Sequence, residues 1–454
     1  MGNQLLIIYP FLFLLFVIPL KAQHLDSLDY LNFYHKHINT YEYGDSLDVP
    51  TKIAGLSRAW AEARFNFSNF DQVPGLNWDS LYFNFIPKVI NATSEIEFYK
   101  LLTRFYSHLN DGHSMIVAPF SLWDSLYAGL PIEAKLIDNQ VVITKNHSNE
   151  TQFQSLEVGK IIERINGMEI HDYIGAIISP YVSFTSSADS LSRIFSYHFT
   201  RGKIDEPIEL QIVSRDGKSS TNTFNRLPQH QVNVLGQQPK ITFSHLTNGI
   251  ILIDVPGFGH ENQTLLLDSI FHLLKPEQAL IIDLRGNNSG LLFNAYELLS
   301  YLHQTKFNAE TILSLVYNPL RRSNHQLSFD SKILTTARQP YWGMQFDGPV
   351  AILIDENTHG NAEIFLASLE NQNNIHLIGS NTSGASGQSL LFRLPGNGMG
   401  FVSTKRNLTA GRSEFYRIGF QADIQINLSL NQFLSGEDPV MEAAINFLEN
   451  QLKE

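Results

Sequence analysis

The chain has 454 residues, 43% of them hydrophobic, and a formal net charge of −12. This size predicts two or three domains, and the negative charge argues against nucleic acid or an anionic membrane as a main partner. The sequence contains no cysteine, which excludes disulfide bonds, thiolate catalysis and cysteine-ligated metal sites.

An uncharged apolar run occupies residues 5–20. It is shorter than the roughly 20 residues that a membrane-spanning helix needs, and Ala22 and a polar segment from Gln23 follow it. We predict a signal peptide over residues 1–22, cleaved after Ala22, and export to the periplasm or the extracellular space. An uncleaved anchor is the alternative. Since no second long apolar run follows, we expect no membrane span after cleavage.

Helical spacing dominates the next part of the chain, where we predict three helices over residues 53–65, 78–90 and 94–109. The third helix ends at Asn110-Asp111-Gly112, a helix-terminating turn. We therefore predict a helical domain over residues 23–120, with His113 directly after its last helix.

Strand and hairpin signals follow. Apolar stretches flank Asp138-Asn139 and Arg215-Asp216-Gly217, and both of these polar segments are typical of hairpin turns. We expect a β-rich module over residues 124–230.

From residue 241 onwards, predicted strands and helices alternate, which is typical of a layered α/β core. The expected strands cover residues 249–255, 279–284 and 350–354, and the expected helices cover residues 263–274 and 294–303. A last helix begins at Pro439, with Asp438 as its N-cap. We assign residues 240–454 to this core.

The central stretch of the core is the turn after the strand at residues 350–354. A polar segment follows this strand, and a helix is predicted from Asn361. Such a strand–turn–helix unit exposes the residue at the turn and points backbone N–H groups outward, as in sites that hold a nucleophile and part of an oxyanion hole. This turn contains His359 and Gly360, with no serine or cysteine at its apex.

Five segments, in this order, resemble the tail-specific protease family, which comprises C-terminal-processing and tricorn-core-like serine peptidases. They lie at residues 109–114, 159–167, 280–290, 357–363 and 378–384. The resemblance implies an α/β fold with a ClpP/crotonase-like ββα core, a PDZ-like β-rich module and an N-terminal helical domain. It also implies serine acyl chemistry on peptides or protein C-termini, with no cofactor.

The same resemblance assigns roles to individual residues. His113 matches the histidine base of tricorn-like members, although a helix-end histidine bonded to backbone is the structural alternative. The N–H groups of Gly290 and Asn361 match the oxyanion donors. The family's loop residues Asp283, Arg285 and Asn287 are expected to hold the shape of the turn.

The nucleophile position is the main departure from the family. The pattern Thr-x-Ser-x-x-Glu corresponds to residues 358–363, which places Gly360 where the serine stands. The lysine base of other members falls near Ala385. The carboxylate that orients the base falls at Tyr416, with Glu414 nearby. We expect His113, Gly290 and Gly360 to line one cleft.

Two functions stay open from the sequence. One is a non-catalytic descendant that binds peptides or protein C-termini. The other is an active serine peptidase in which His113 serves as base for a substitute hydroxyl, with Thr358, Ser289, Ser386 and Ser389 as candidates. A metal site formed by His113 and His359 is a weaker alternative, since no carboxylate motif accompanies the two histidines.

Overall fold

A computed structural model describes residues 47–453 of the protein, except for residues 236–239, 260–262, 276–277 and 371. The signal peptide expected at residues 1–22 lies outside this range. The described part is a mixed α/β fold that begins with a helical region. None of its helices is long and apolar enough to cross a membrane.

Three helices form the N-terminal region, as the sequence predicts: α2 (Val49–Asn66), α3 (Trp78–Ile90) and α4 (Glu95–Ser107). Each begins at a side-chain cap, from Asp48, Asn77 and Ser94 respectively, which accepts a backbone N–H of the first turn. The helices pack around a core rich in aromatic residues, including Phe98 and Phe105.

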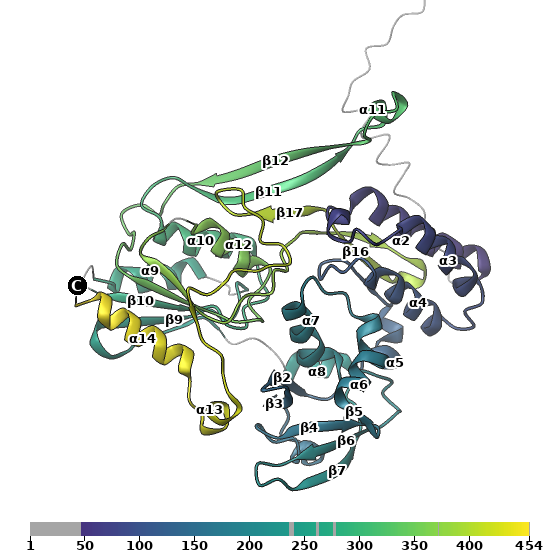
Figure 1. Ribbon diagram of the computed structural model, residues 1–454, viewed down its shortest axis with the longest axis horizontal. Coiled ribbons are helices and arrows are strands. Elements are labelled where there is room, and N and C mark those ends of the chain that lie inside the picture. The colour runs from purple at the N-terminus through teal and green to yellow at the C-terminus, as the bar shows by residue number, and fades with distance from the viewer. Residues whose placement is uncertain (1–46, 236–239, 260–262, 276–277, 371, 454) are drawn as a thin grey trace, which may run out of the picture. The chain divides into compact units, whose positions relative to one another are not determined.

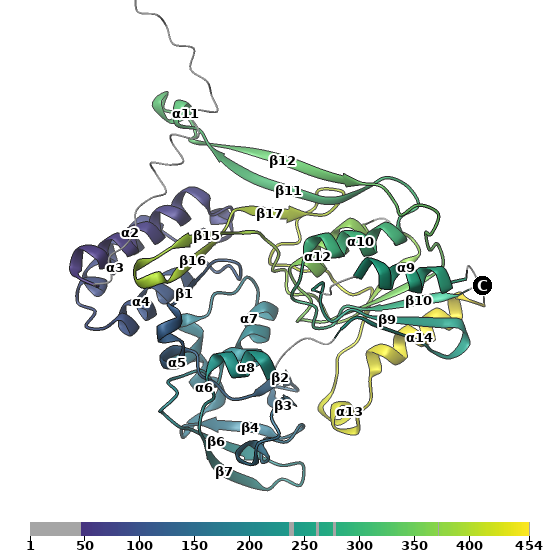
Figure 2. The same ribbon diagram turned by 180° about the vertical axis from the view of Figure 1, so that it is seen from behind.

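A small antiparallel sheet completes this helical core from the far end of the chain. It consists of β1 (Met115–Val117), β16 (Met399–Ser403) and β15 (Ser389–Arg393). Phe392, Leu394 and Val402 belong to the same buried cluster as the three helices. In Figures 1 and 2, the small sheet lies beside the N-terminal helices. Residues far apart in sequence therefore share one core.

The β-rich part is a sheet in the order β2-β3-β4-β6-β7, with a short β5 paired to β4. Its strands are β2 (Ile132–Ile137), β3 (Gln140–Asn146), β4 (Ile161–Ile165), β5 (Met168–Glu169), β6 (Ile208–Val213) and β7 (Ser219–Phe224). The helices around it are α5 (Trp123–Leu126), α6 (Ile170–Tyr173), α7 (Ser187–Arg193) and α8 (Gln229–Leu235). The two predicted hairpins are present: β2 pairs with β3, and β6 pairs with β7. In their turns, Asp138, Asn139 and Gly217 adopt the positive φ angles that such turns require.

The α/β core contains a six-stranded sheet in the order β18-β14-β13-β10-β9-β8, in which only β8 is antiparallel. The strands are β8 (Thr242–His245), β9 (Ile250–Asp254), β10 (Ala279–Asp283), β13 (Val350–Ile354), β14 (Ile375–Gly379) and β18 (Ile424–Gln425). Every residue of β10 and β13 is buried, as expected for central strands covered on both faces.

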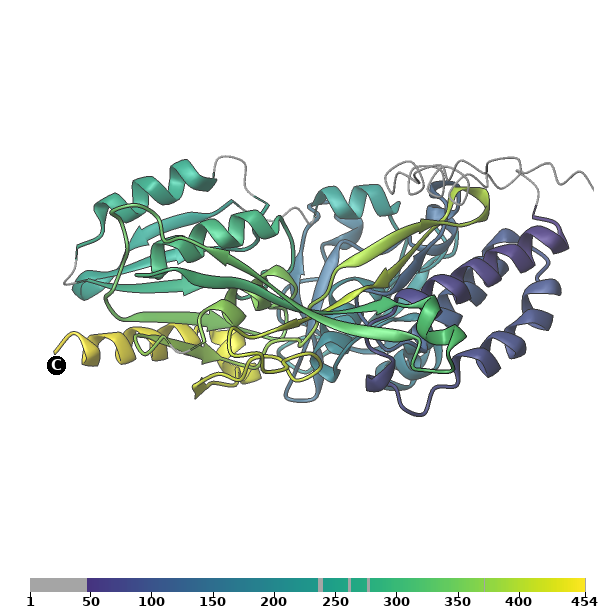
Figure 3. The ribbon, with the colours of Figure 1, turned by 90° about the horizontal axis from the view of Figure 1, so that it is seen from above.

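Helices cover both faces of this sheet (Figure 3). One face packs on α9 (Gln263–Leu273), α10 (Leu292–Leu302) and α12 (Asn361–Ser368), and the other packs on α14 (Pro439–Gln451). The short α13 (Leu430–Ser435) precedes α14. This arrangement places the carboxyl ends of β10 and β13 side by side, next to the start of α12.

The sequence analysis did not predict a long antiparallel arm formed by β11 (Phe307–Tyr317) and β12 (Phe329–Arg338), which pairs with β17 (Lys405–Leu408). Helix α11 (Pro319–Ser323) lies at the turn between the two long strands (Figure 1). A buried ion pair between Lys405 and Glu310 (2.6 Å) joins β17 to β11.

Candidate active site

The candidate site is built on the turn between β13 and α12. Gly360 is the N-cap of α12 and has φ 64° and ψ −117°, a conformation that L side chains rarely adopt. A Cβ atom added to Gly360 would meet no atom within 4 Å among the described residues. The turn thus has the sharp backbone of a nucleophile elbow and open space where a side chain would project.

Asp355 and Thr358 fasten the turn to the neighbouring strand end. The Asp355 carboxylate accepts a hydrogen bond from the N–H of Gly286 (2.9 Å) and forms an ion pair with Lys135 (3.0 Å). Burial alone would raise the pKa of Asp355, but Lys135 and the Gly286 N–H hold it below the ordinary value. The Thr358 hydroxyl donates to the carbonyl of Leu284 (2.9 Å). These bonds fix the shape of the turn.

Glu363, in the first turn of α12, holds a second loop against the site. Its buried carboxylate accepts the Thr382 hydroxyl (2.6 Å) and the N–H groups of Gly384 (2.6 Å) and Ala385 (2.8 Å). Burial raises the pKa of Glu363 to about 8. The loop it holds contacts the turn directly, since the N–H of Gly360 donates to the carbonyl of Ala385 (3.2 Å).

His113 packs on the other side of this loop. A Cβ added to Gly387 would lie 3.4 Å from the His113 Cγ, and the Ser389 hydroxyl donates to the His113 carbonyl (2.7 Å). The structure therefore brings the segments of His113 and Gly360 together across residues 385–387. The Nδ1 of His113 is buried and has no hydrogen-bond partner in the described part of the chain.

Burial and a neighbouring cation keep His113 neutral. Desolvation, followed by the Arg193 guanidinium, lowers the pKa of His113 to about 4. The pKa of His359 is also lowered, by burial, by Arg193 and by His113 itself. Arg193 lies in α7, where its Nε donates to the buried carboxylate of Asp189 (2.6 Å). Two neutral imidazoles thus lie near one buried ion pair.

The expected oxyanion donors also lie together. Gly290 has φ 107°, and a Cβ added there would lie 2.1 Å from the carbonyl carbon of Phe258, so only glycine fits. The Asn361 side-chain amide donates to the Gly290 carbonyl (2.8 Å). The two residues are therefore joined at the start of α12, where backbone N–H groups and the helix dipole favour a negatively charged oxygen.

Tyr416, at the position of the orienting carboxylate, is buried and donates its hydroxyl to Asp111 (2.8 Å). The other oxygen of Asp111 accepts the Ser114 hydroxyl (2.5 Å). Glu414, the nearby carboxylate, forms an ion pair with Arg406 (2.8 Å). Neither tyrosine nor carboxylate is bonded to the His113 ring.

The loop residues expected to hold the turn have structural contacts. Arg285 bridges Asp283 (2.7 Å) and Asp438 (2.8 Å), the N-cap of α14. The Asn287 side-chain amide donates to the carbonyl of Val255, and the backbone carbonyl of Asn287 accepts the N–H of His359 (3.1 Å). The described residues contain no cluster of histidine and carboxylate side chains that could hold a metal ion.

Comparison with known proteins identifies the core. The family model of "Peptidase family S41" matches residues 249–426, the span that contains the turn, the loop held by Glu363 and Tyr416. Over this span the chain is a homologue of peptidase family S41. No curated protein matches its sequence.

Solved structures extend the likeness of the S41 fold beyond the core. Mature CPAF complexed with lactacystin is similar with a TM-score of 0.67 at 13% identity, covering 90% of this chain and 98% of that chain. The photosystem II D1 C-terminal processing protease has a TM-score of 0.50 at 14% identity, covering 83% of this chain and 93% of that chain. At these identities the comparisons establish the shared fold.

Four hydroxyls of the S41 site were candidates for a substitute nucleophile. Thr358 donates to Leu284, and Ser389 donates to His113. Ser289 is exposed, before Gly290. Ser386 is fully buried, and its hydroxyl has no partner among the described residues.

Sequence reasoning did not assign roles to Asp111, Glu363, Asp189 or Arg193. The first two lie within the motifs that carried the family resemblance. Asp189 and Arg193 belong to no such motif; their i, i+4 spacing on α7 is typical of an ion pair, but it does not indicate the position of that pair beside His113.

Proposed function

We propose that this chain is an exported homologue of the tail-specific serine peptidases that binds peptides or protein C-termini and has lost most or all proteolytic activity. The observation that carries the proposal is Gly360. A serine peptidase needs a hydroxyl at the apex of this turn, and glycine has no side chain to attack a carbonyl carbon.

The surroundings of His113 support the loss of catalysis. A general base works best with a pKa near the operating pH, whereas burial and Arg193 lower the pKa of His113 to about 4. Its Nδ1 lacks a carboxylate to orient the ring, and Tyr416 uses its hydroxyl on Asp111. The nucleophile and the orienting group are therefore absent together.

The remaining features favour binding. Backbone donors at Gly290 and Asn361 suit a carbonyl or carboxylate oxygen of a peptide. We further propose that residues 124–230 form a PDZ-like module and that the core is crotonase-like. One structural relative is named as a C-terminal processing protease, and we extend recognition of C-termini to this chain on that basis.

An active peptidase is the second candidate, and Ser386 is the observation that favours it. Its unpartnered hydroxyl lies in the loop between Ala385, which binds the Gly360 N–H, and Gly387, which packs on His113. In this alternative, His113 would accept the Ser386 proton as the hydroxyl oxygen attacks the peptide carbonyl.

Peptide turnover and serine labelling distinguish the two candidates. We expect the purified protein to bind a library of unstructured peptides with free C-termini, but to release no cleaved product and to take up no fluorophosphonate. Labelling or cleavage that Ser386→Ala abolishes would establish the second candidate in place of the first.

Export has its own test. We expect intact-mass measurement on protein from the native host to show a chain that starts at Gln23. A mass that includes residues 1–22 would reject cleavage.

A further inference from the structure

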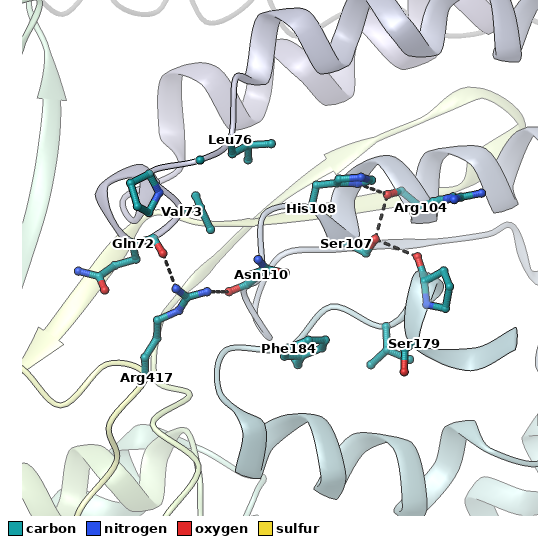
Figure 4. A pocket seen from close by; sticks show the side chains of 14 residues that line it. Gln72, Val73, Leu76, Arg104, Ser107, His108, Asn110, Ser179, Phe184 and Arg417 are labelled. Carbon is teal, nitrogen blue, oxygen red and sulfur yellow. Dashed lines mark hydrogen bonds between the residues drawn. The ribbon is translucent and has the colours of Figure 1, made fainter. Parts of the chain in front are cut away.

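A pocket of about 710 Å³ lies between the N-terminal helices and the segment that precedes α7 (Figure 4). Its size is within the range of small-ligand sites. The loop before α3, the end of α4, residues 179–184 and Arg417 line it. Apolar side chains, including Val73, Leu76, Val182 and Phe184, form much of its wall. None of the residues that form the candidate active site lines this pocket.

The charged residues that line the pocket are all positive. Arg104 and Arg417 line it, and no aspartate or glutamate does. Neither guanidinium forms an ion pair in the described part of the chain. Other arginines do pair with carboxylates: Arg193, Arg285, Arg321 and Arg406. Since a guanidinium stays protonated at any physiological pH, the pocket retains positive charge.

Arg417 carries its charge in an unusual setting. It is one of the few non-glycine residues with positive φ (69°), a conformation that persists where the surroundings impose it. Its guanidinium donates only to neutral backbone carbonyls, those of Gln72 and Asn110 (3.3 Å to Asn110), and its Nε is buried without an acceptor among the described residues. Figure 4 shows this side chain beside Gln72 and Asn110. The guanidinium is thus held in place without an anion to balance it.

We propose that this pocket binds a carboxylate attached to an apolar group, with the carboxylate at the Arg417 guanidinium and the apolar group against Val182 and Phe184. Arginine favours planar carboxylates because its N–H groups are arranged to bind both oxygens. A larger polyanion would leave its remaining oxygens against the apolar wall, where unpaired polar groups are costly.

The carboxylate can come from a free organic acid or from the end of a peptide chain. The position of the pocket does not decide between them, although it adjoins the candidate site. Asn110 lies three residues before His113 in the sequence, and the backbone N–H of Arg417 donates to the carbonyl of Gly384 (2.8 Å). The site does not depend on whether the Gly360 cleft cleaves or binds peptides.

Calorimetric titration of the full protein tests the proposal with two pairs of probes. The first pair is 4-methylpentanoate and its primary amide, and the second is acetyl-Ala-Ala-Leu with a free or an amidated C-terminus. We expect at least one free acid to bind at least ten-fold more tightly than its amide, because charge-assisted hydrogen bonds to arginine are lost in the amide. Binding of the small acid indicates a free organic acid as ligand, and binding of the peptide acid alone indicates a chain terminus.

Variants locate the binding. Arg417→Lys keeps the charge but loses the planar donor arrangement, and we expect it to weaken binding of the free acid about ten-fold. Arg104 is exposed, so Arg104→Gln should fold normally, and the loss of its positive charge from the pocket wall should weaken binding less than Arg417→Lys does. Lys100→Gln, on the same helix as Arg104 but outside the pocket, is the matched control. Equal binding of acids and amides, no binding of either acid at 10 mM as a rough upper limit of a specific site, or equal loss in Lys100→Gln would overturn the proposal.

Discussion

The frame of the turn and the reactive positions beside it differ in how completely their polar groups are used. In the frame, Asp355 and Glu363 each accept several hydrogen bonds that join the turn to neighbouring segments. At the reactive positions, Gly360 has no side chain and the Nδ1 of His113 has no partner in the described residues. The polar groups of the frame are thus bonded, whereas the two candidate reactive positions offer no bonded side-chain group.

Separate sets of residues therefore determine the shape of the site and its chemistry. Bonds to Asp355 and Glu363 stabilise the folded state whether or not a substrate reacts, so losing them would cost stability. A hydroxyl at position 360 would contribute to turnover and would add backbone strain. The proposed loss of the nucleophile is therefore compatible with an intact fold, and each set of residues can be altered on its own.

The largest expected effect comes from restoring a hydroxyl. Gly360→Ser places an oxygen in the open space above the start of α12, and we expect the variant to be labelled by a fluorophosphonate, unlike the natural protein. Loss of a serine nucleophile typically lowers turnover about 10⁶-fold, so even a partial gain is measurable by gel fluorescence.

Two controls accompany this variant. Gly360→Ala has the same backbone strain without a hydroxyl and should stay unlabelled. His113→Ala in the Gly360→Ser background should abolish labelling if His113 accepts the proton. If Gly360→Ser folds and stays unlabelled, His113 does not reach the turn as we propose.

The next largest effect concerns the frame. Glu363→Ala leaves three buried donors without an acceptor, the Thr382 hydroxyl and the N–H groups of Gly384 and Ala385. At about 1–3 kcal/mol for each of the three unsatisfied groups, we expect the free energy of unfolding to fall by about 3–9 kcal/mol, measured by urea denaturation. Glu442→Ala, an exposed glutamate of α14, should change it by less than about 0.5 kcal/mol. A small effect of Glu363→Ala would show that the loop does not depend on this carboxylate.

Acid should lower the free energy of unfolding through protonation of His113. Its pKa is lowered from 6.5 to about 4 in the folded state, so the unfolded chain binds the proton more tightly. Stability is therefore full above about pH 6.5 and falls as the pH drops towards 4. At pH 4.5 we expect the His113 contribution to the loss to be about 2–3 kcal/mol relative to pH 7.5.

Comparison with His113→Gln isolates this residue, since other buried histidines also titrate. Urea denaturation of both proteins at the two pH values should give a smaller loss in His113→Gln. Equal losses would mean that the ring is exposed to solvent in the folded protein.

The smallest effect is expected at Tyr416. Tyr416→Phe removes one of the two side-chain donors to the buried Asp111, and we expect a loss of about 1–2 kcal/mol in the free energy of unfolding. Tyr181→Phe, at an exposed tyrosine, should have little effect. An unchanged or raised stability in Tyr416→Phe would show that Asp111 does not depend on this hydroxyl.

The sequence predicted the elements that local patterns determine. The buried strand before the turn, the start of α12 at Asn361 and the Asp438 cap of α14 all lie where apolar periodicity and capping residues placed them. The structure also places His113 and Gly360 on segments that meet, although these residues are far apart in sequence. The family motifs, rather than periodicity, carried that expectation.

Contacts between distant segments without a motif were not predicted. The outer strand β12 of the β11–β12 arm is largely exposed, so it lacks the apolar alternation that marks a half-buried strand. The positions of Arg193 beside His113 and of Arg417 in the pocket depend on how the β-rich part and the last loops pack. No local pattern encodes such packing.

The small sheet that completes the helical core has a consequence for how the chain folds. During synthesis, α2, α3 and α4 emerge well before Phe392, Leu394 and Val402, which complete their core. Contacts of such long sequence separation slow folding, because a large loop must close before they form. We therefore expect a fragment that ends before residue 389 to expose the apolar side of its helices. These helices thus wait for segments made much later before they reach their final packing.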